Sequence, residues 1–136
     1  AVRRSAPSPG PSVLVVLHPG PILTAGGGSY LDRLVELAGG RNAFGGLGAP
    51  WPVVSLEAVV QRDPDVVVVA GEGADPPSWM TRDSRWAGLA AVRSGRVLVL
   101  PEALLSRPGP SIVETAGRLA AFFEEIGDPG DREGGG

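Results

Sequence analysis

The sequence predicts an α/β fold, a three-layer α/β/α lobe with a mainly parallel sheet flanked by helices. Residues 13–17 (VLVVL) and 66–70 (VVVVA) are short, continuous apolar runs rich in β-branched side chains, as is typical of strands covered on both faces. Segments with a helical spacing of apolar residues alternate with these runs. Such an alternation of strands and helices favours parallel strands joined by right-handed crossovers.

The folded body is expected to span residues 13–126 as one α/β lobe. Residues 1–12 are a Pro-rich lead-in, and residues 127–136 (GDPGDREGGG) are a polar tail that we expect to be flexible. The body of about 115 residues is long enough to build one hydrophobic core.

The first strand is followed by a loop over residues 18–28 and then by a helix. Ser29 is a typical N-cap, and the helix ends at the glycine pair Gly39-Gly40. The apolar positions of this helix have helical spacing and are Leu31, Leu34, Val35, Leu37 and Ala38.

The next segment, residues 44–54, has no regular pattern, and its prolines on either side of Trp51 predict an extended backbone. Ser55 is expected to cap a helix over residues 56–62. Glu57 lies in the first turn of that helix, where the helix dipole favours a carboxylate. Asp63-Pro64-Asp65 ends the helix and precedes the strand 66–70.

The remaining elements follow the same alternation. The polar segment 71–77 leaves the carboxyl end of the second strand, which is where open α/β sheets place ligands. Short helices are predicted around residues 84–87 and 89–92, and then a strand over residues 96–100. Pro110 opens a final helix with apolar positions at Ile112, Val113, Ala116, Leu119, Ala120, Phe123 and Ile126.

Composition excludes several classes of function. The net charge is -3 and the pI about 5.1, which gives no general electrostatic reason to expect nucleic acid, because binding to phosphates needs a basic face. The chain has no cysteine and one histidine, which excludes disulfides, Cys-ligated metals and multi-histidine sites. The apolar runs are too short to span a bilayer, and no signal-peptide pattern is present, so we expect a mature, truncated or cytosolic chain.

Few residues suggest catalysis. Gly26-Gly27-Gly28-Ser29 before a helix resembles a phosphate-binding loop, but it fits neither the dinucleotide pattern nor the P-loop, and the chain has no lysine. Ser29, Ser55 and Ser111 are explained as helix caps. His18 is expected to be a hydrogen-bonded structural residue rather than a base or an axial ligand, and Asp63 and Asp65 flank a helix end. We therefore predict a protein that is not an enzyme.

Aromatic side chains in loops point instead to ligand binding. Trp51 and Trp79 lie in Pro-rich segments rather than at periodic core positions, and such rings suit a broad, flat apolar ligand. Arg107 would supply an orienting polar group, because a guanidinium presents a fan of donors. The alternative is that each ring folds back on its own domain.

Three stretches, in order, resemble the vitamin B12 and iron-siderophore (class III) periplasmic substrate-binding proteins of ABC importers. They are TAGGGSYLDRLVELAGGRNAF (24–44), WPVVSLE (51–57) running on to DPDVVVV (63–69), and residues 86–99 with RPGP (107–110). The match corresponds to the C-terminal lobe of these two-lobed proteins and covers nearly the whole body.

The resemblance implies specific partners and site residues. It implies a lobe that clamps cobalamin or a ferric chelate, such as a ferric siderophore or haem, against a missing N-terminal lobe and delivers it to an ABC permease outside the cytoplasm. Glu57 matches the glutamate that docks on the permease, and Trp51 and Arg107 match positions that line the ligand cleft. Leu23 falls where cobalamin-binding members can carry an aromatic ring, and Leu23 together with Ser106 departs from their pattern.

Two other functions stay open at this point. A small α/β enzyme domain would bind a nucleotide at the Gly26 loop, and an isolated lobe would act as an interaction domain or homodimer through its bared cleft. No intrinsic cofactor is expected, only a transported ligand, and a single lobe should bind that ligand weakly because it covers only one face.

Overall fold

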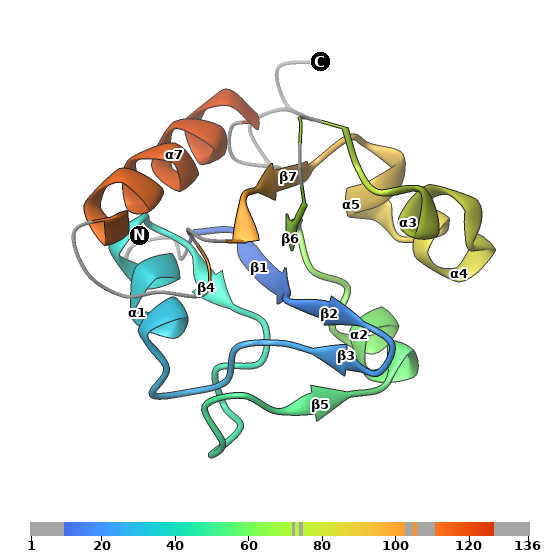
Figure 1. Cartoon of the computed structure of the whole chain (residues 1–136), viewed down its shortest axis with the longest axis horizontal. Coiled ribbons are helices and arrows are strands. Elements are labelled where there is room, and N and C mark those ends of the chain that lie inside the picture. Colours follow the sequence, from blue (N-terminus) through green and yellow to red (C-terminus); the bar gives the residue numbers. More distant parts are fainter. Residues whose placement is uncertain (1–9, 72, 74, 103–104, 106–110, 127–136) are drawn as a thin grey trace.

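The computed structural model describes residues 10–71, 73, 75–102, 105 and 111–126. The greater part of the Pro-rich lead-in and the whole C-terminal tail lie outside these residues, so the expected boundaries of the lobe stay predictions. Within the described part, strands and helices alternate along the chain (Figure 1).

The centre of the molecule is a four-stranded sheet in the order β4-β1-β6-β7, and each of its three pairings is parallel. β1 spans Ser12–Val16, β6 spans Val66–Ala70 and β7 spans Val97–Leu100, close to the predicted ranges. The edge strand β4, Arg41–Asn42, was not predicted. A two-residue polar strand carries no hydrophobic pattern, so only its pairing with β1 identifies it.

Alternate residues of the central strands enter two separate hydrophobic clusters. In β1, Val13 and Val15 belong to one cluster, whereas Leu14 and Val16 belong to the other. The same alternation occurs in β6 and β7, as expected when successive side chains of a strand point to opposite faces. Because both faces are buried, the strands are apolar throughout.

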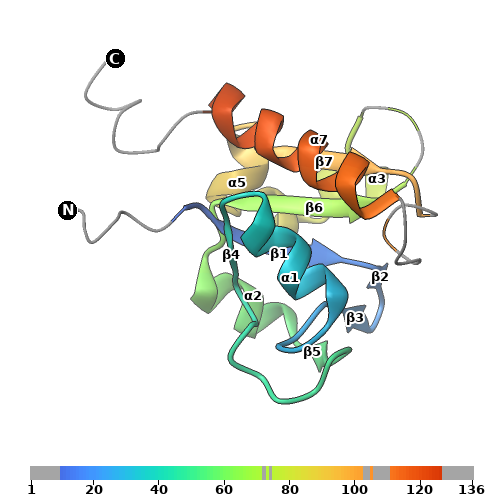
Figure 2. The same ribbon diagram turned by 90° about the vertical axis from the view of Figure 1, so that its left-hand side faces the viewer.

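One face of the sheet is covered by α1, Tyr30–Leu37, and α7, Ser111–Ile126. Leu31, Leu34 and Val35 of α1 pack in the same cluster as Leu119 and Phe123 of α7. Figure 2 shows these two helices in front of the sheet, with β6 and β7 behind them.

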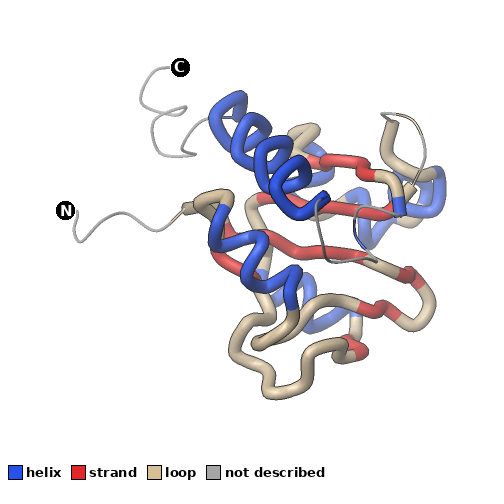
Figure 3. The backbone as a smooth tube through the Cα atoms, turned by 60° about the vertical axis from the view of Figure 1, so that its left-hand side comes forward, coloured by secondary structure: helices blue, strands red, loops and turns tan. Residues whose placement is uncertain are grey.

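The other face is covered by four short helices. They are α2 (Leu56–Arg62), α3 (Ser78–Arg82), α4 (Ser84–Ala87) and α5 (Ala90–Arg93). Figure 3 shows strands between the two sets of helices, which confirms the predicted three-layer α/β/α lobe.

A small antiparallel sheet, β2-β3-β5, occupies part of the segments predicted as irregular. β2 is His18–Pro19, β3 is Ile22–Leu23 and β5 is Val53–Val54. The prediction of a plain loop over residues 18–28 was therefore wrong. Strands of two residues leave no periodicity in a sequence, and β3 pairs with a segment about 30 residues away along the chain.

Two of the three predicted helix caps, Ser29 and Ser55, are present; Ser111 is the first residue of α7. The Ser29 hydroxyl accepts a hydrogen bond from the Asp32 N–H, and the Ser55 hydroxyl accepts one from the Ala58 N–H, each over 3.1 Å. Glu57 lies in the first turn of α2 and is exposed, as expected. Within the described ranges, no helix combines the length and apolar character needed to cross a membrane.

Candidate functional site

A hollow of about 340 Å³ opens beside the carboxyl ends of the central strands. Leu17 and His18 directly follow β1, while Glu102 and Leu105 follow β7. Leu23 of β3 and Trp51, which precedes β5, come from the small antiparallel sheet and its approach. This is the edge at which open α/β sheets bind ligands. We call these six residues the strand-end pocket.

The pocket contains two of the four predicted ligand-binding residues, Leu23 and Trp51. Arg107 lies outside the described residues. Trp79 is elsewhere: it lies on α3, partly buried, and its ring meets that of Trp86 edge to face at 5.3 Å. The expectation that Trp79 is on a loop was wrong, because Pro77 begins a helix that buries Met80. Whether Trp79 contacts a ligand stays a prediction.

Trp51 is held in place although its segment has no regular structure. Its neighbours in the chain are tied to the segment before α1: the Gly26 N–H donates to the Pro50 carbonyl over 2.9 Å, and the Thr24 N–H donates to the Pro52 carbonyl over 3.1 Å. The indole remains 41% exposed. The backbone is thus anchored while much of the ring is left free for contact.

Tyr30 links two walls of the strand-end pocket. Its ring contacts Trp51 edge to face, with 6.0 Å between ring centroids, and its hydroxyl donates to the carbonyl of Leu105. Burial raises the pKa of the Tyr30 phenol, which keeps it in the protonated form that donates this bond. Tyr30 was not singled out from the sequence, because both of its partners are distant in the chain.

The glycine-rich segment before α1 also holds the backbone around Trp51 in place. The Gly27 N–H donates to the Leu47 carbonyl over 3.0 Å, and the Ser29 hydroxyl donates to the Gly26 carbonyl over 2.9 Å. A Cβ on Gly26 would lie 2.0 Å from the Ala49 carbonyl oxygen, so only glycine permits this close approach. The N–H groups of Gly26 and Gly27 are occupied by the chain itself, which removes support from the nucleotide-binding hypothesis.

His18 and Glu102 form the polar part of the strand-end pocket, and sequence reasoning assigned neither of them to a ligand site. Both side chains are exposed. The Nδ1 atom of His18 accepts a long hydrogen bond, 3.4 Å, from the Gly20 N–H. Their positions immediately after strand ends were the available signal, since parallel strands bring these ends to one edge.

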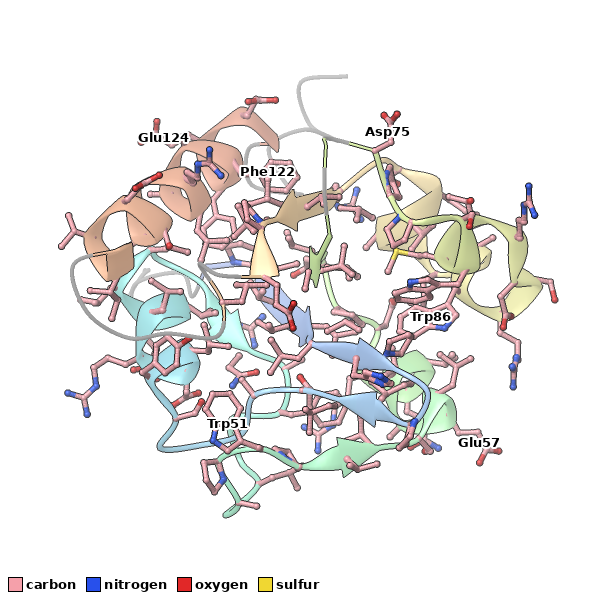
Figure 4. The ribbon with its side chains drawn as sticks, viewed as in Figure 1. Trp51, Glu57, Asp75, Trp86, Phe122 and Glu124 are labelled. Atoms are coloured by element: carbon pink, nitrogen blue, oxygen red, sulfur yellow. The ribbon has the colours of Figure 1, made fainter. Side chains whose placement is uncertain are left out.

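Glu57 belongs to a different surface. It lines a second hollow, of about 250 Å³, with Leu56, Val60, Gln61 and Arg85. Figure 4 shows Glu57 at the end of the molecule beyond α2, well separated from Trp51 and directed outward. Arg85 is paired with Asp83 over 3.2 Å, and the hydrogen bond from Arg85 lowers the pKa of the Asp83 carboxyl.

The described side chains include no group of three or more His, Asp or Glu residues arranged to hold a metal ion. The strand-end pocket combines an exposed aromatic ring and three leucines with two polar groups. It is therefore suited to bind a ligand with a flat apolar body and polar edges.

Comparison with known proteins gives concordant results. The family model described as periplasmic binding protein matches residues 1–104. A vitamin B12-binding protein of Vibrio parahaemolyticus is 29% identical over 110 residues, which is 78% of this chain and 38% of that protein. The chain thus spans well under half the length of the curated relatives it matches.

Solved structures agree in fold. The periplasmic vitamin B12-binding protein of Vibrio cholerae superposes with a TM-score of 0.71 at 26% identity, covering 88% of this chain and 46% of that one. An ABC-type Fe3+-hydroxamate transport system protein of Saccharomonospora viridis gives a TM-score of 0.71 at 25% identity, covering 83% of this chain and 41% of that one.

Proposed function

The chain belongs to the periplasmic binding protein family, and we propose that it is the C-terminal lobe of the solute-binding component of an ABC importer. The transported ligand is cobalamin or another corrinoid, or a ferric chelate such as a siderophore or haem. The observation that carries the proposal is the strand-end pocket, with the Trp51 ring exposed at the carboxyl edge of the sheet. Such a component binds its ligand outside the cytoplasmic membrane and catalyses no reaction.

The chemistry of the pocket supports a metal chelate with a large organic frame. Trp51 and the three leucines offer apolar surface to such a frame, and aromatic rings bury a large area at little cost in side-chain freedom. The pocket is open to solvent. The curated relatives of this chain are more than twice as long as the chain itself. A second lobe would close over the exposed face of the ligand.

A single lobe should bind weakly on this proposal. Ligand sites normally bury most of the ligand surface, whereas one wall covers one face. We expect dissociation constants weaker than micromolar for this chain. Micromolar or tighter binding of cobalamin would contradict the two-lobe mechanism.

We assign permease docking to Glu57. Its carboxylate is exposed on the first turn of α2, and no described residue forms an ion pair with it. It lies outside the strand-end pocket, so a permease contact there would not compete with the ligand. Exposed rim charges of this kind mainly steer association and set its dependence on salt.

The test uses the three tryptophans as internal reporters. In the 15N-labelled chain each indole Nε1–H gives one NMR signal, which a Trp→Phe variant at each position assigns. We expect dicyanocobinamide, which is diamagnetic, titrated to millimolar concentration, to shift the Trp51 signal and to leave that of Trp86, 4% exposed in the core, unchanged. A ferric hydroxamate carries high-spin iron and should instead broaden the Trp51 signal more than that of Trp86.

Two results would overturn the proposal. One is an unchanged Trp51 signal with all corrinoid and ferric chelates. The other is a shift of the Gly26 and Gly27 amides on addition of ATP, which would revive the nucleotide site. The same titration shows whether Trp79 takes part in binding, because its indole signal is resolved separately.

A further inference from the structure

We infer that the strand-end pocket selects chelates whose edges carry neutral amide groups over chelates whose edges carry carboxylates. The inference rests on the proposed function and narrows its ligand class. It comes from the two polar residues of the pocket, Glu102 and His18, neither of which has been assigned a role.

The strand-end pocket carries a negative charge at Glu102. Glu102 is exposed and lines the pocket, and the other described lining residues are leucines, Trp51 and His18. Among the described residues, no arginine faces Glu102 across this hollow. The chain as a whole also carries a net charge of -3. A ligand carboxylate that approaches Glu102 therefore meets a like charge.

The second observation concerns the hydrogen atom of His18. The Gly20 N–H donates to Nδ1. In a neutral imidazole the proton then resides on Nε2, which is a donor. The described part of the pocket thus offers a ligand an acceptor, the Glu102 carboxylate, and a donor, the Nε2–H of His18.

A primary amide matches this pair. Its NH₂ group donates to a carboxylate and its carbonyl accepts from an imidazole N–H, whereas a carboxylate can only accept. The amide side chains around a corrin ring satisfy both residues while the ring lies on Trp51 and the leucines. A ring edged with carboxylates leaves Glu102 without a donor and adds repulsion.

The experiment compares two ligands with the same corrin ring. Dicyanocobinamide carries amides, and dicyanocobyrinic acid carries carboxylic acids in their place. Binding of both to the full chain is followed by the Trp51 indole signal, and we expect the amide ligand to bind more tightly. Glu102→Gln should reduce the ratio of the two affinities by about three- to tenfold. This is the range expected when one like charge near the ligand carboxylates is removed.

Glu124→Gln is the matched control, because it removes the same charge from an exposed position on α7, far from Trp51 in Figure 4. It should leave the ratio of the two affinities unchanged. His18→Gln, which retains a donor, should bind dicyanocobinamide better than His18→Ala. Equal narrowing by both Glu→Gln variants would mean that general charge, and not the pocket, sets the preference, which overturns the inference.

The remaining outcomes separate the inference from the proposed function. Tighter binding of the acid by the unsubstituted chain would overturn the selectivity while supporting chelate binding, and it would assign the dominant charge to Arg107. Failure of both corrins and of a ferric hydroxamate to shift or broaden the Trp51 signal would refute the proposed function, and the selectivity with it.

Discussion

Two pairs of aromatic rings in this molecule have nearly the same geometry and opposite surroundings. Tyr30 and Trp51 meet edge to face at 6.0 Å and 67°, and Trp79 and Trp86 do so at 5.3 Å and 73°. Trp51 is 41% exposed at the strand-end pocket, whereas Trp86, on α4, is 4% exposed in the core. Figure 4 shows the two tryptophans on opposite sides of the body.

The contrast shows what makes an aromatic pair available for binding. In the buried pair, Trp86 lies in the core cluster and the partly buried Trp79 packs against that cluster, so their contact energy contributes to folding. In the exposed pair, Tyr30 meets Trp51 edge to face, and Trp51 stays 41% exposed. The same residue type thus has a structural role on one side and a proposed binding role on the other.

The largest effect should come from the buried pair. Trp86→Ala removes a ring from the core cluster and is expected to lower the free energy of unfolding by about 3–5 kcal/mol. Urea denaturation followed by circular dichroism measures this loss. A loss no larger than that of Trp51→Ala would contradict the assignment of Trp86 to the core.

In the exposed pair, replacing the tryptophan should affect ligand affinity more than stability. Trp51→Ala is expected to lower the free energy of unfolding by about 1 kcal/mol or less, since the ring has few core contacts. Its affinity for dicyanocobinamide should fall by about tenfold or more, as for an aromatic anchor of a binding site. Because this variant lacks the Trp51 indole, its binding is measured from the backbone amide NMR signals of residues around the pocket. Trp51→Phe keeps an aromatic ring and should retain part of the affinity.

The anchoring of the exposed pair can be tested at its helix cap. Ser29 is buried and bonds both the Asp32 N–H and the Gly26 carbonyl, so Ser29→Ala should cost about 1–2 kcal/mol in the free energy of unfolding. Ser55→Ala removes an exposed cap with one such bond and should cost about 1 kcal/mol or less. Equal losses in urea denaturation would indicate that the Gly26 bond contributes nothing.

The smallest effect should come from the Tyr30 hydroxyl. Tyr30→Phe keeps the ring contact with Trp51 and removes the bond to Leu105, at a cost of about 0.5–1 kcal/mol. The raised pKa of Tyr30 makes its stabilising effect complete below the ordinary value of 10.0 and lost as the pH rises through the folded-state value. Unfolding free energies from pH 8 to 11 should therefore fall more steeply for the unsubstituted chain than for Tyr30→Phe.

Features of the fold that depend on neighbouring residues were predictable from the sequence. The caps at Ser29 and Ser55 and the apolar strands β1, β6 and β7 each depend on a few adjacent residues. The strands β2, β3, β4 and β5 were not predicted, because two residues are too few to show a pattern, and the partners of β4 and β5 are also distant in the chain.

The site was only partly predictable for the same reason. Trp51 was found from its Pro-rich context and Leu23 through family resemblance, while Tyr30 and Glu102 were missed. An acidic residue after a strand is indistinguishable in sequence from any solvated side chain. Only the meeting of the ends of β1 and β7 brings Glu102 to the same hollow as His18. Conversely, the Pro-rich context of Trp79 concealed a short helix.

The backbone bonds from Thr24, Gly26 and Gly27 to the segment around Trp51 have a consequence for the rate of recognition. Because the segment is fastened before any ligand arrives, the entropy of ordering it is lost during folding and not during the encounter. An arriving chelate should then dock on a ready surface in one kinetic phase. Any slower second phase in the two-lobed protein would report the approach of the other lobe.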